Sequence, residues 1–382
     1  MHNPYAGVDW EKVQKIQSAS HMHLVGQSHL ENAYRYGIRH FPISNYYPSV
    51  PYRADTRLSD FRLRQWWPAI RDGKRIDPPI DWNGVIDWQD ELEEEYRDQF
   101  PFIETEPTYT TIPDDAILSS NAEHHGYSNS NAHICSPGSS FASGTFDVHN
   151  NYHLNQHGFP VGFGGTWQEA FEGMIEHLDY PDGGGITVNH PTWFSRFTDE
   201  QVFDFLDFDD RVLGIEIYND YSWKRDWYQN PDYKKPDEPE QGFSLSMWDR
   251  ILASGRRCWG FCVPDHSAGG GNWQGRCVLL VQDYTEHACL KAYRDGCFYG
   301  CLTGEGVSLT GFEASETSLS VSLSGPAEIR LIVDAEVAQT MTGANAAFDV
   351  PQSNGSPDVG YVRVEIQDET GERLFLQPVR YR

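Results

Sequence analysis

Hydrophobic residues follow two periodicities between residues 160 and 303. A spacing of three to four residues predicts helices, and short unbroken apolar runs between them predict buried strands. The expected helices cover 166–180, 198–206, 244–255 and 285–296, and the expected strands cover 186–188, 212–217 and 258–263. Thr198 is suited to cap the second helix, and Gly296 to end the last one. Such alternation of helices and strands is typical of a mostly parallel sheet or barrel.

The same pattern is present in the first part of the chain. Strands are expected at 16–20, 38–43 and 116–120, with a short helix at 30–36 that Gly37 breaks. The pattern fails from residue 47 to about 113, where proline, tryptophan and acidic residues gather. We expect a long insertion there, partly helical near 88–99. It is either a lid, because long loops in compact domains tend to be functional, or a surface excursion.

The character of the chain changes after Gly304. Residues 307–382 contain no histidine, cysteine or tryptophan, and apolar and polar positions alternate there with a period of two. Such runs lie at 319–323, 329–333, 347–350, 361–366 and 374–379, with turn residues between them. They predict a small antiparallel β-sandwich of about six strands. The expected domains are therefore 1–304, which includes the insertion, and 305–382.

Polar residues of the kinds that bind metals follow six of the expected strands. These segments are His21-Met22-His23, Ser44-Asn45-Tyr46-Tyr47, Asn121-Ala122-Glu123-His124-His125, Asn189-His190-Pro191, Tyr218-Asn219-Asp220 and Pro264-Asp265-His266. The C-terminal ends of parallel barrel strands form one shared rim, where active sites lie. Alternation along an extended segment puts both imidazoles of the His-x-His on one side. Imidazoles and carboxylates suit Zn, Mn or Fe, so the sequence predicts a metal site at this rim.

The order of these motifs resembles the polymerase-and-histidinol-phosphatase (PHP) family of metal-dependent phosphoesterases. The resemblance rests on His21-Met22-His23, Asn189-His190-Pro191 and Asp265-His266 and covers residues 14 to 303. It implies an α/β fold, a distorted (β/α)7 barrel, and typically two or three divalent metal ions. The added C-terminal sandwich is similar to that of PHP-like metallohydrolases with such an appendage.

The resemblance also implies a set of metal ligands. His21 and His23 match the opening His-x-His, His29 a further family histidine, and Glu123 the bridging glutamate. His190 and Asp265 match two later ligands. One more histidine is expected between Glu123 and His190. His133, His149 and His153 are all candidates, and His133 is favoured because 132–135 has the pattern of a short strand.

Two positions depart from the family pattern. The family's Thr-Asp-His after the second strand is Ser44-Asn45-Tyr46 here, and its closing Asp-x-His is Asp265-His266-Ser267. Both changes affect ligands of one metal position, so one or two metals are expected more than three. An alternative alignment places Glu123-His124 in the position of the Thr-Asp-His.

The amino-acid composition limits the kinds of partner that this protein can bind. The 56 acidic residues against 29 Lys and Arg give a net charge of −27, which disfavours a nucleic-acid partner. No run approaches the ~18 apolar residues of a membrane span, and residues 1–10 lack the features of a secretory signal. Seven cysteines without a Cys-x-x-Cys pattern fit reduced, buried thiols. We expect a cytoplasmic protein that acts on a small molecule, and we leave open whether it forms homo-oligomers.

The predicted function is a metal-dependent phosphoesterase. His21, His23, Glu123 and Asp265 are expected to hold one metal, and Glu123 bridges to a second held by His133 and His190. A metal-activated water attacks the phosphorus, and His266 or His124 protonates the leaving oxygen. Two alternatives stay open. One is a carbamate, ester or amide hydrolase on the same barrel, and the other is a non-catalytic carbohydrate- or ligand-binding protein.

Overall fold

The structure is a computed structural model of the 382-residue chain. It describes residues 1–24, 26–44, 69–71, 74–76, 109, 111–126, 132–141, 145–146, 166–193, 197–221 and 242–382. Most of the expected insertion at 47–113, together with Asn45, Tyr46, His149 and His153, lies outside these residues. The structural statements below concern the described residues.

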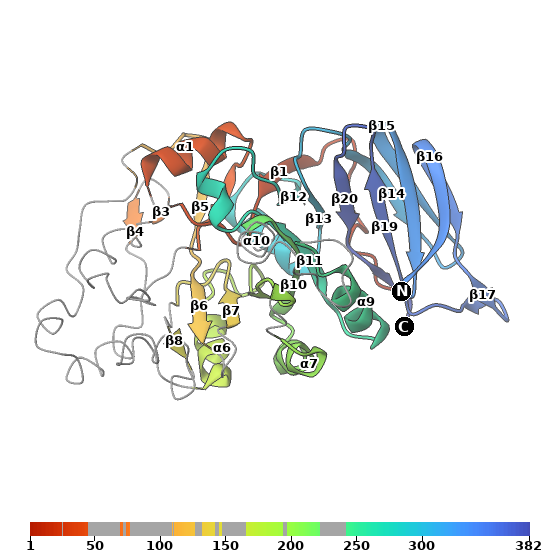
Figure 1. Ribbon diagram of the computed structural model, residues 1–382, viewed down its shortest axis with the longest axis horizontal. Helices are drawn as coiled ribbons and strands as arrows, with labels where there is room; N and C mark the ends of the chain where they lie inside the picture. Colours follow the sequence, from red (N-terminus) through yellow and green to blue (C-terminus); the bar gives the residue numbers. More distant parts are fainter. Residues whose placement is uncertain are drawn as a thin grey trace, which may run out of the picture.

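Two large sheets form the framework (Figure 1). The first has 11 strands. Its main path runs β14 (Leu309–Ala314), β15 (Ser318–Val333), β19 (Tyr361–Gln367), β20 (Arg373–Leu376), β13 (Phe298–Cys301), β12 (Arg276–Val281), β1 (Gln14–Ser18), β2 (His40–Pro42) and β5 (Ile117–Ser119). The second has six, in the order β11 (Trp259–Val263), β10 (Val212–Asn219), β9 (Ile186–Val188), β7 (Ala132–Cys135), β6 (Glu123–Gly126) and β8 (Thr145–Phe146).

Five α-helices lie in the described part of the chain. They are α1 (Gln27–Arg35), α6 (Trp167–Glu176), α7 (Asp199–Phe208), α9 (Leu245–Ala253) and α10 (Glu286–Asp295). Apolar residues of α6, α7 and α9 share one core with strands β9 and β10. Residues of α10 pack with β11, β12 and β13 in another core. The helices expected from periodicity near 166, 198, 244 and 285 are thus confirmed, each within a few residues.

The sheets mix parallel and antiparallel pairs. Parallel pairs join β1 to β2, β2 to β5, and β10 to both β9 and β11. Strand β12, however, is antiparallel to β1 and to β13, and β7 is antiparallel to β6 and β9. The sequence interpretation of a mostly parallel sheet missed β12 and β13, which follow one another through α10. The structure confirms a mixed α/β fold, whereas closure into a seven-stranded barrel stays a prediction.

The two sheets meet where their strands end in polar residues. An isolated bridge pairs Met22, beyond β1, with Asp265, beyond β11, and His23 and Asp265 are joined through their backbones. Asn121, between β5 and β6, donates to the carbonyls of Ser20 and Pro42 at 2.8 and 2.9 Å. Its own carbonyl accepts from the Ser136 N–H beyond β7. One buried amide therefore ties together the ends of strands from both sheets.

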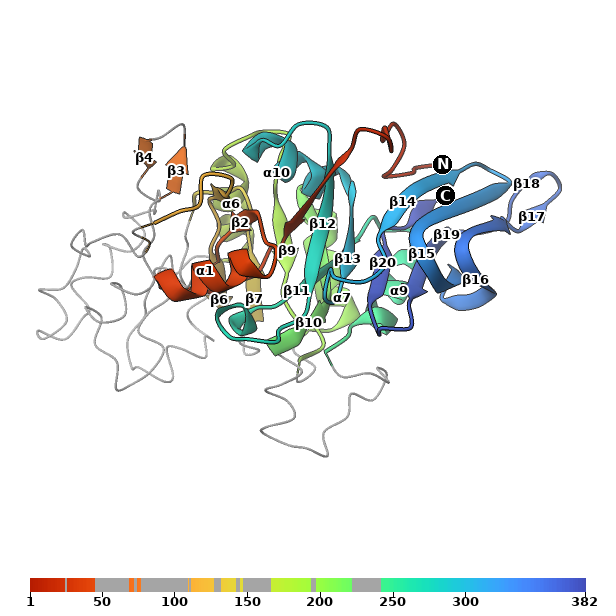
Figure 2. The same ribbon diagram turned by 90° about the horizontal axis from the view of Figure 1, so that it is seen from above.

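Long antiparallel strands dominate the chain after residue 309 (Figure 2). β16 (Glu336–Asp349) pairs along β15, and β21 (Val379–Arg380) pairs with β19. The expected runs at 319–323 and 329–333 are one strand, β15, with a register shift between Ser322 and Ala327. A turn is expected between these runs, but Gly325 and Pro326 instead fall within the irregular stretch of the strand, where a proline is tolerated.

The boundary expected at residue 304 falls inside a continuous sheet, because β13 pairs with β20. The division into two domains therefore stays a prediction. Two small hairpins lie outside the large sheets: β3 (Ala69–Arg71) with β4 (Lys74–Ile76), and β17 (Gln352–Ser353) with β18 (Ser356–Pro357). Among the described residues no helix is long and apolar enough to cross a membrane. The seven cysteines are free thiols.

Candidate metal centre

Glu123 lies at the centre of a buried group of histidines and carboxylates. Its Oε1 is 3.2 Å from His21 Nε2 and 2.7 Å from His133 Nδ1, and its Oε2 is 2.9 Å from His23 Nε2. His190 Nε2 lies 3.8 Å from Oε1. The Glu123 side chain is only 1% exposed. A single carboxylate thus contacts imidazoles that belong to three separate parts of the chain.

Asp265 completes one end of the group. Its Oδ1 is 3.3 Å from His21 Nε2 and 3.4 Å from His23 Nε2, and these two nitrogens are 3.1 Å apart. Ligands about 2.0 Å from a tetrahedral zinc lie about 3.3 Å from one another. Imidazole lone pairs and carboxylate oxygens at these distances repel one another unless a proton or a metal ion lies among them. The residues present therefore fit a metal ion.

Four overlapping groups of three ligand atoms arise from this arrangement. They are His21/His190/Asp265, His21/His23/Glu123, His23/Asp265/His266 and Glu123/His133/His190, each with all ligand atoms within 4.8 Å of one another. Glu123 belongs to two of these groups, one with His23 and one with His133. Glu123 therefore lies between two adjacent groups, with its Oε1 near His21 and His133 and its Oε2 near His23.

The strands explain why these side chains converge. His21, His190 and Asp265 follow β1, β9 and β11, as the sequence predicted. Glu123 lies instead within β6, and His133 lies within β7, where a short strand was expected. Because side chains alternate between the two faces of β6, the residue next to Glu123 points to the opposite face. His124 therefore contacts Ser136 Oγ, at 2.9 Å, and lies outside the four groups.

His29, expected as a further ligand, also lies outside these groups. His29 lies on α1 and packs closely against Gly269. A Cβ atom added to that glycine would lie 2.5 Å from His29 Nδ1. Burial lowers the pKa of His29. The residues that the structure brings together are thus His21, His23, Glu123, His133, His190, Asp265 and His266, while His29 and His124 lie apart.

The protonation of each residue in the group depends strongly on the charges of its neighbours. Burial opposes protonation of His21, but Asp265, Glu123 and Glu216 outweigh it and raise the pKa of His21 well above its ordinary value. Burial raises the pKa of Asp265, yet the nearby His21 and His266 lower it overall. Both shifts show that the buried carboxylates favour a positive charge among the imidazoles.

His266 lies at the more accessible edge of the group. Its ring stacks on His23 with centroids 3.8 Å apart, and its side chain is 28% exposed. Desolvation and the neighbouring His23 lower the pKa of His266 to about 3. A neutral imidazole offers a lone pair to a metal or a proton, and the general-acid role expected for His266 stays a prediction.

Two further residues hold the candidate ligands in place. The sequence interpretation placed Asn219 at the rim but gave no role to Glu216. Glu216 on β10 accepts from His21 Nδ1 at 2.7 Å and from the backbone N–H of His190 at 2.6 Å. Asn219 donates to Glu216 at 2.8 Å and to Asp265 at 3.1 Å. A signal was present, since Glu216 is the one charged residue in the apolar run 212–217. A buried carboxylate in such a strand requires partners.

Two of the candidate ligands have strained backbones. His190 and Asp265 have φ values of 27° and 54°, which residues other than glycine seldom adopt. Such conformations cost about 1–3 kcal/mol each and cluster at functional sites. Glu216 holds the His190 N–H, and the Asp265 side chain accepts from the N–H of His266 at 2.6 Å. Local hydrogen bonds thus offset the strain at both positions.

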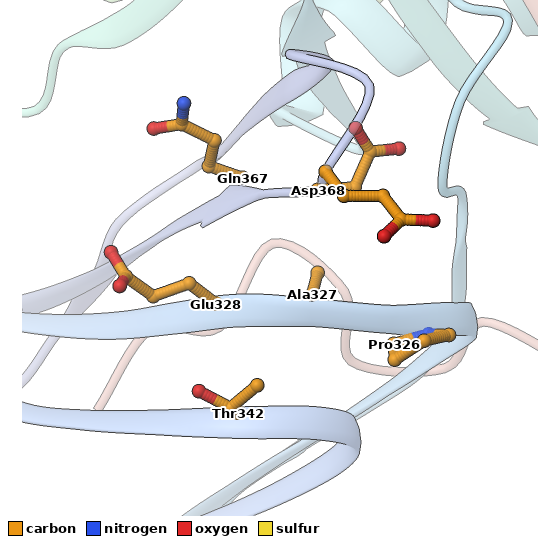
Figure 3. Close-up of a pocket in the computed structure, with 7 residues that line it drawn as sticks. Pro326, Ala327, Glu328, Thr342, Gln367 and Asp368 are labelled. Carbon is orange, nitrogen blue, oxygen red and sulfur yellow. The ribbon is translucent and has the colours of Figure 1, made fainter.

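A polar hollow lies far along the first sheet, in the C-terminal strands. It has a volume of about 490 Å³ and lies over the middle of β15 and β16, beside the end of β19 (Figure 3). Glu328, Thr342 and Asp368 are among the residues that line it, and no histidine does among the described residues. The histidine cluster around Glu123 is therefore the stronger candidate for chemistry.

Comparisons with known proteins give one match. No family model matches the chain, and no curated protein matches it. One solved structure matches, a two-domain protein containing a predicted PHP-like metal-dependent phosphoesterase from Bacteroides vulgatus. The identity is 11% and the TM-score 0.40, over 94% of this chain and 91% of that one. A likeness at this level does not define the fold or the function of this chain.

Proposed function

We propose that this chain is a metal-dependent phosphoesterase on a distorted seven-stranded barrel of the PHP type. The observation that supports it is the convergence of His21, His23, His133 and His190 on the two oxygens of Glu123. The site takes two divalent ions. His21, His23, Glu123 and Asp265 hold one, and Glu123, His133 and His190 hold the other. Zinc, manganese and iron all suit this donor set.

Bound divalent ions would supply polarisation of the phosphoryl oxygen and an activated water. The protein residues position the ions and neutralise their charge. Glu123 lies between the two positions, because its Oε2 contacts His23 of the first, whereas its Oε1 contacts both His21 of the first and His133 of the second. His266, at the accessible edge, has the proton-transfer role: its neutral imidazole takes a proton from the attacking water and returns it to the leaving oxygen.

The substrate we propose is a small phosphorylated molecule, and the protein acts without a nucleic-acid partner. The net charge of −27 disfavours a polyanion. Two-metal sites in general also serve for the hydrolysis of carboxylic esters and amides. The class of reaction is therefore tested directly.

The test is a paired panel of phosphomonoesters, phosphodiesters and carboxylic esters, assayed with zinc- or manganese-loaded protein that carries no histidine tag. We expect phosphoester turnover that is lost in Glu123→Ala and kept in His287→Ala, a change at an exposed histidine paired with Asp182. Turnover of carboxylic esters alone would instead support the ester hydrolase. Turnover of neither, in protein shown to hold metal, would contradict the proposal.

A further inference from the structure

We propose that Glu216 is a positioning residue, which selects the imidazole tautomer of His21 and fixes the backbone of His190 so that both present Nε2 to the metal site. The inference rests on the metal site proposed above and adds a residue that binds no metal itself. Glu216 is absent from all four ligand groups, although its side chain is buried beside them.

The contacts of Glu216 divide between its two oxygens. Oε1 faces His21 Nδ1 at 2.7 Å. Oε2 accepts from the His190 N–H at 2.6 Å and from Asn219 Nδ2 at 2.8 Å. An ionised carboxylate only accepts, so all three partners must donate. His21 must then carry a proton on Nδ1, so Nε2 is the nitrogen through which it can bind a metal, in place of any proton there.

Neither orientation of a glutamine reproduces these contacts. If its oxygen faces the two donors His190 N–H and Asn219, its NH2 group faces His21 Nδ1. That nitrogen must then accept, and the imidazole proton moves to Nε2, where it blocks ligation. If the amide is flipped, the His190 N–H and the Asn219 amide face another donor. The first orientation leaves fewer groups unsatisfied and is the one we expect.

The same carboxylate couples the two metal positions. His21 belongs to the first position and His190 to the second, and Glu216 contacts both. Asn219 extends the link, because its amide also donates to Asp265 Oδ2 at 3.1 Å. Groups at the ends of β1, β9, β10 and β11 are thereby joined. Partners that orient metal ligands in this way typically contribute 10–100-fold to metal affinity.

The first measurement is zinc affinity, determined by competition with a chromogenic chelator. We expect Glu216→Gln to bind zinc about 10–100-fold more weakly than the wild type. Glu216→Asp keeps the negative charge at a shorter reach, so we expect it to recover part of the loss. Glu372→Gln is the matched control, since Glu372 is equally buried but accepts from the backbone of residues 302–305. It should leave zinc affinity unchanged.

The second measurement needs no metal. In metal-free wild type, the His21 Nδ1 proton should give a slowly exchanging, strongly downfield NMR resonance, which Glu216→Gln should abolish. Wild-type zinc affinity and a retained resonance in Glu216→Gln would overturn the inference while the metal site stands. If the wild type itself binds no zinc, the metal site is refuted and the purpose assigned to Glu216 with it. Circular dichroism of each variant separates either result from misfolding.

Discussion

At the scale of single residues, the cluster depends on one buried carboxylate with four imidazoles around it. Residue types and their order along the chain were sufficient to predict His21, His23, Glu123, His133, His190 and Asp265 as neighbours, because each lies in or just after a strand. They were insufficient for His124 and His29. Which face of β6 a side chain occupies depends on pairing with β7, and the position of α1 depends on packing. Glu216 was missed because its role requires the relative positions of β1, β9 and β10.

His190 offers the first prediction at this scale. In the proposed site its imidazole serves the second metal position, together with Glu123 and His133. We expect His190→Ala to lose that metal and nearly all hydrolytic activity while keeping its fold, since the ring is one of three ligands proposed there among the described residues. Metal content and far-UV circular dichroism check this. His287→Ala is the control. Full activity of His190→Ala without bound metal would refute the assignment.

At the scale of secondary-structure elements, local signals predicted the helices well and the strand pairing poorly. Thr198 caps α7, and Gly296 ends α10 in a left-handed conformation, as expected from the sequence. Both effects involve neighbouring residues only. The antiparallel strand β12 pairs with β1, more than 250 residues away in sequence, and β15 pairs with β16 on both sides of the irregular stretch that contains Gly325 and Pro326. No local pattern carries such information.

Thr198 supplies the prediction for elements. Its side chain accepts from the Gln201 N–H, and Gln201 bonds back to the Thr198 N–H, so two donors at the helix start are satisfied. We expect Thr198→Ala to lower the free energy of unfolding by about 1 kcal/mol, as capping residues typically do. Thr198→Ser keeps the hydroxyl and should lose much less. Chemical denaturation measures both. Equal losses in the two variants would argue against the cap.

At the scale of the whole molecule, buried polar contacts join the C-terminal strands to the rest. Arg363 on β19 makes a bidentate pair with Asp249 on α9, with both distances 2.7 Å, and Tyr361 also donates to Asp249. Burial opposes the charge of Arg363, yet Asp249 and Glu365 raise the pKa of Arg363 overall. In Figure 1, α9 lies beside β19 and β20. The continuous sheet and this ion pair predict that the parts unfold together.

A substitution at Asp249 tests whether the two parts unfold together. Removing one partner leaves the buried Arg363 without its bidentate acceptor, and breaking such a pair costs about 3–5 kcal/mol. We expect Asp249→Ala to lower the midpoint of a single cooperative urea transition by a corresponding amount. Asp182→Ala, at an exposed pair with His287, is the control and should change little. An unchanged midpoint, or two separate transitions in the wild type, would contradict cooperative unfolding of the two parts.

The central claim is that the carboxylate of Glu123 bridges two metal ions, and metal content tests it most directly. Elemental analysis by inductively coupled plasma mass spectrometry, on tag-free protein reconstituted and dialysed, gives the number of ions per chain. We expect two equivalents of zinc, manganese or iron, and a loss of both in Glu123→Ala. One equivalent would contradict the bridged pair. None after reconstitution would contradict the metal centre itself and favour a binding protein.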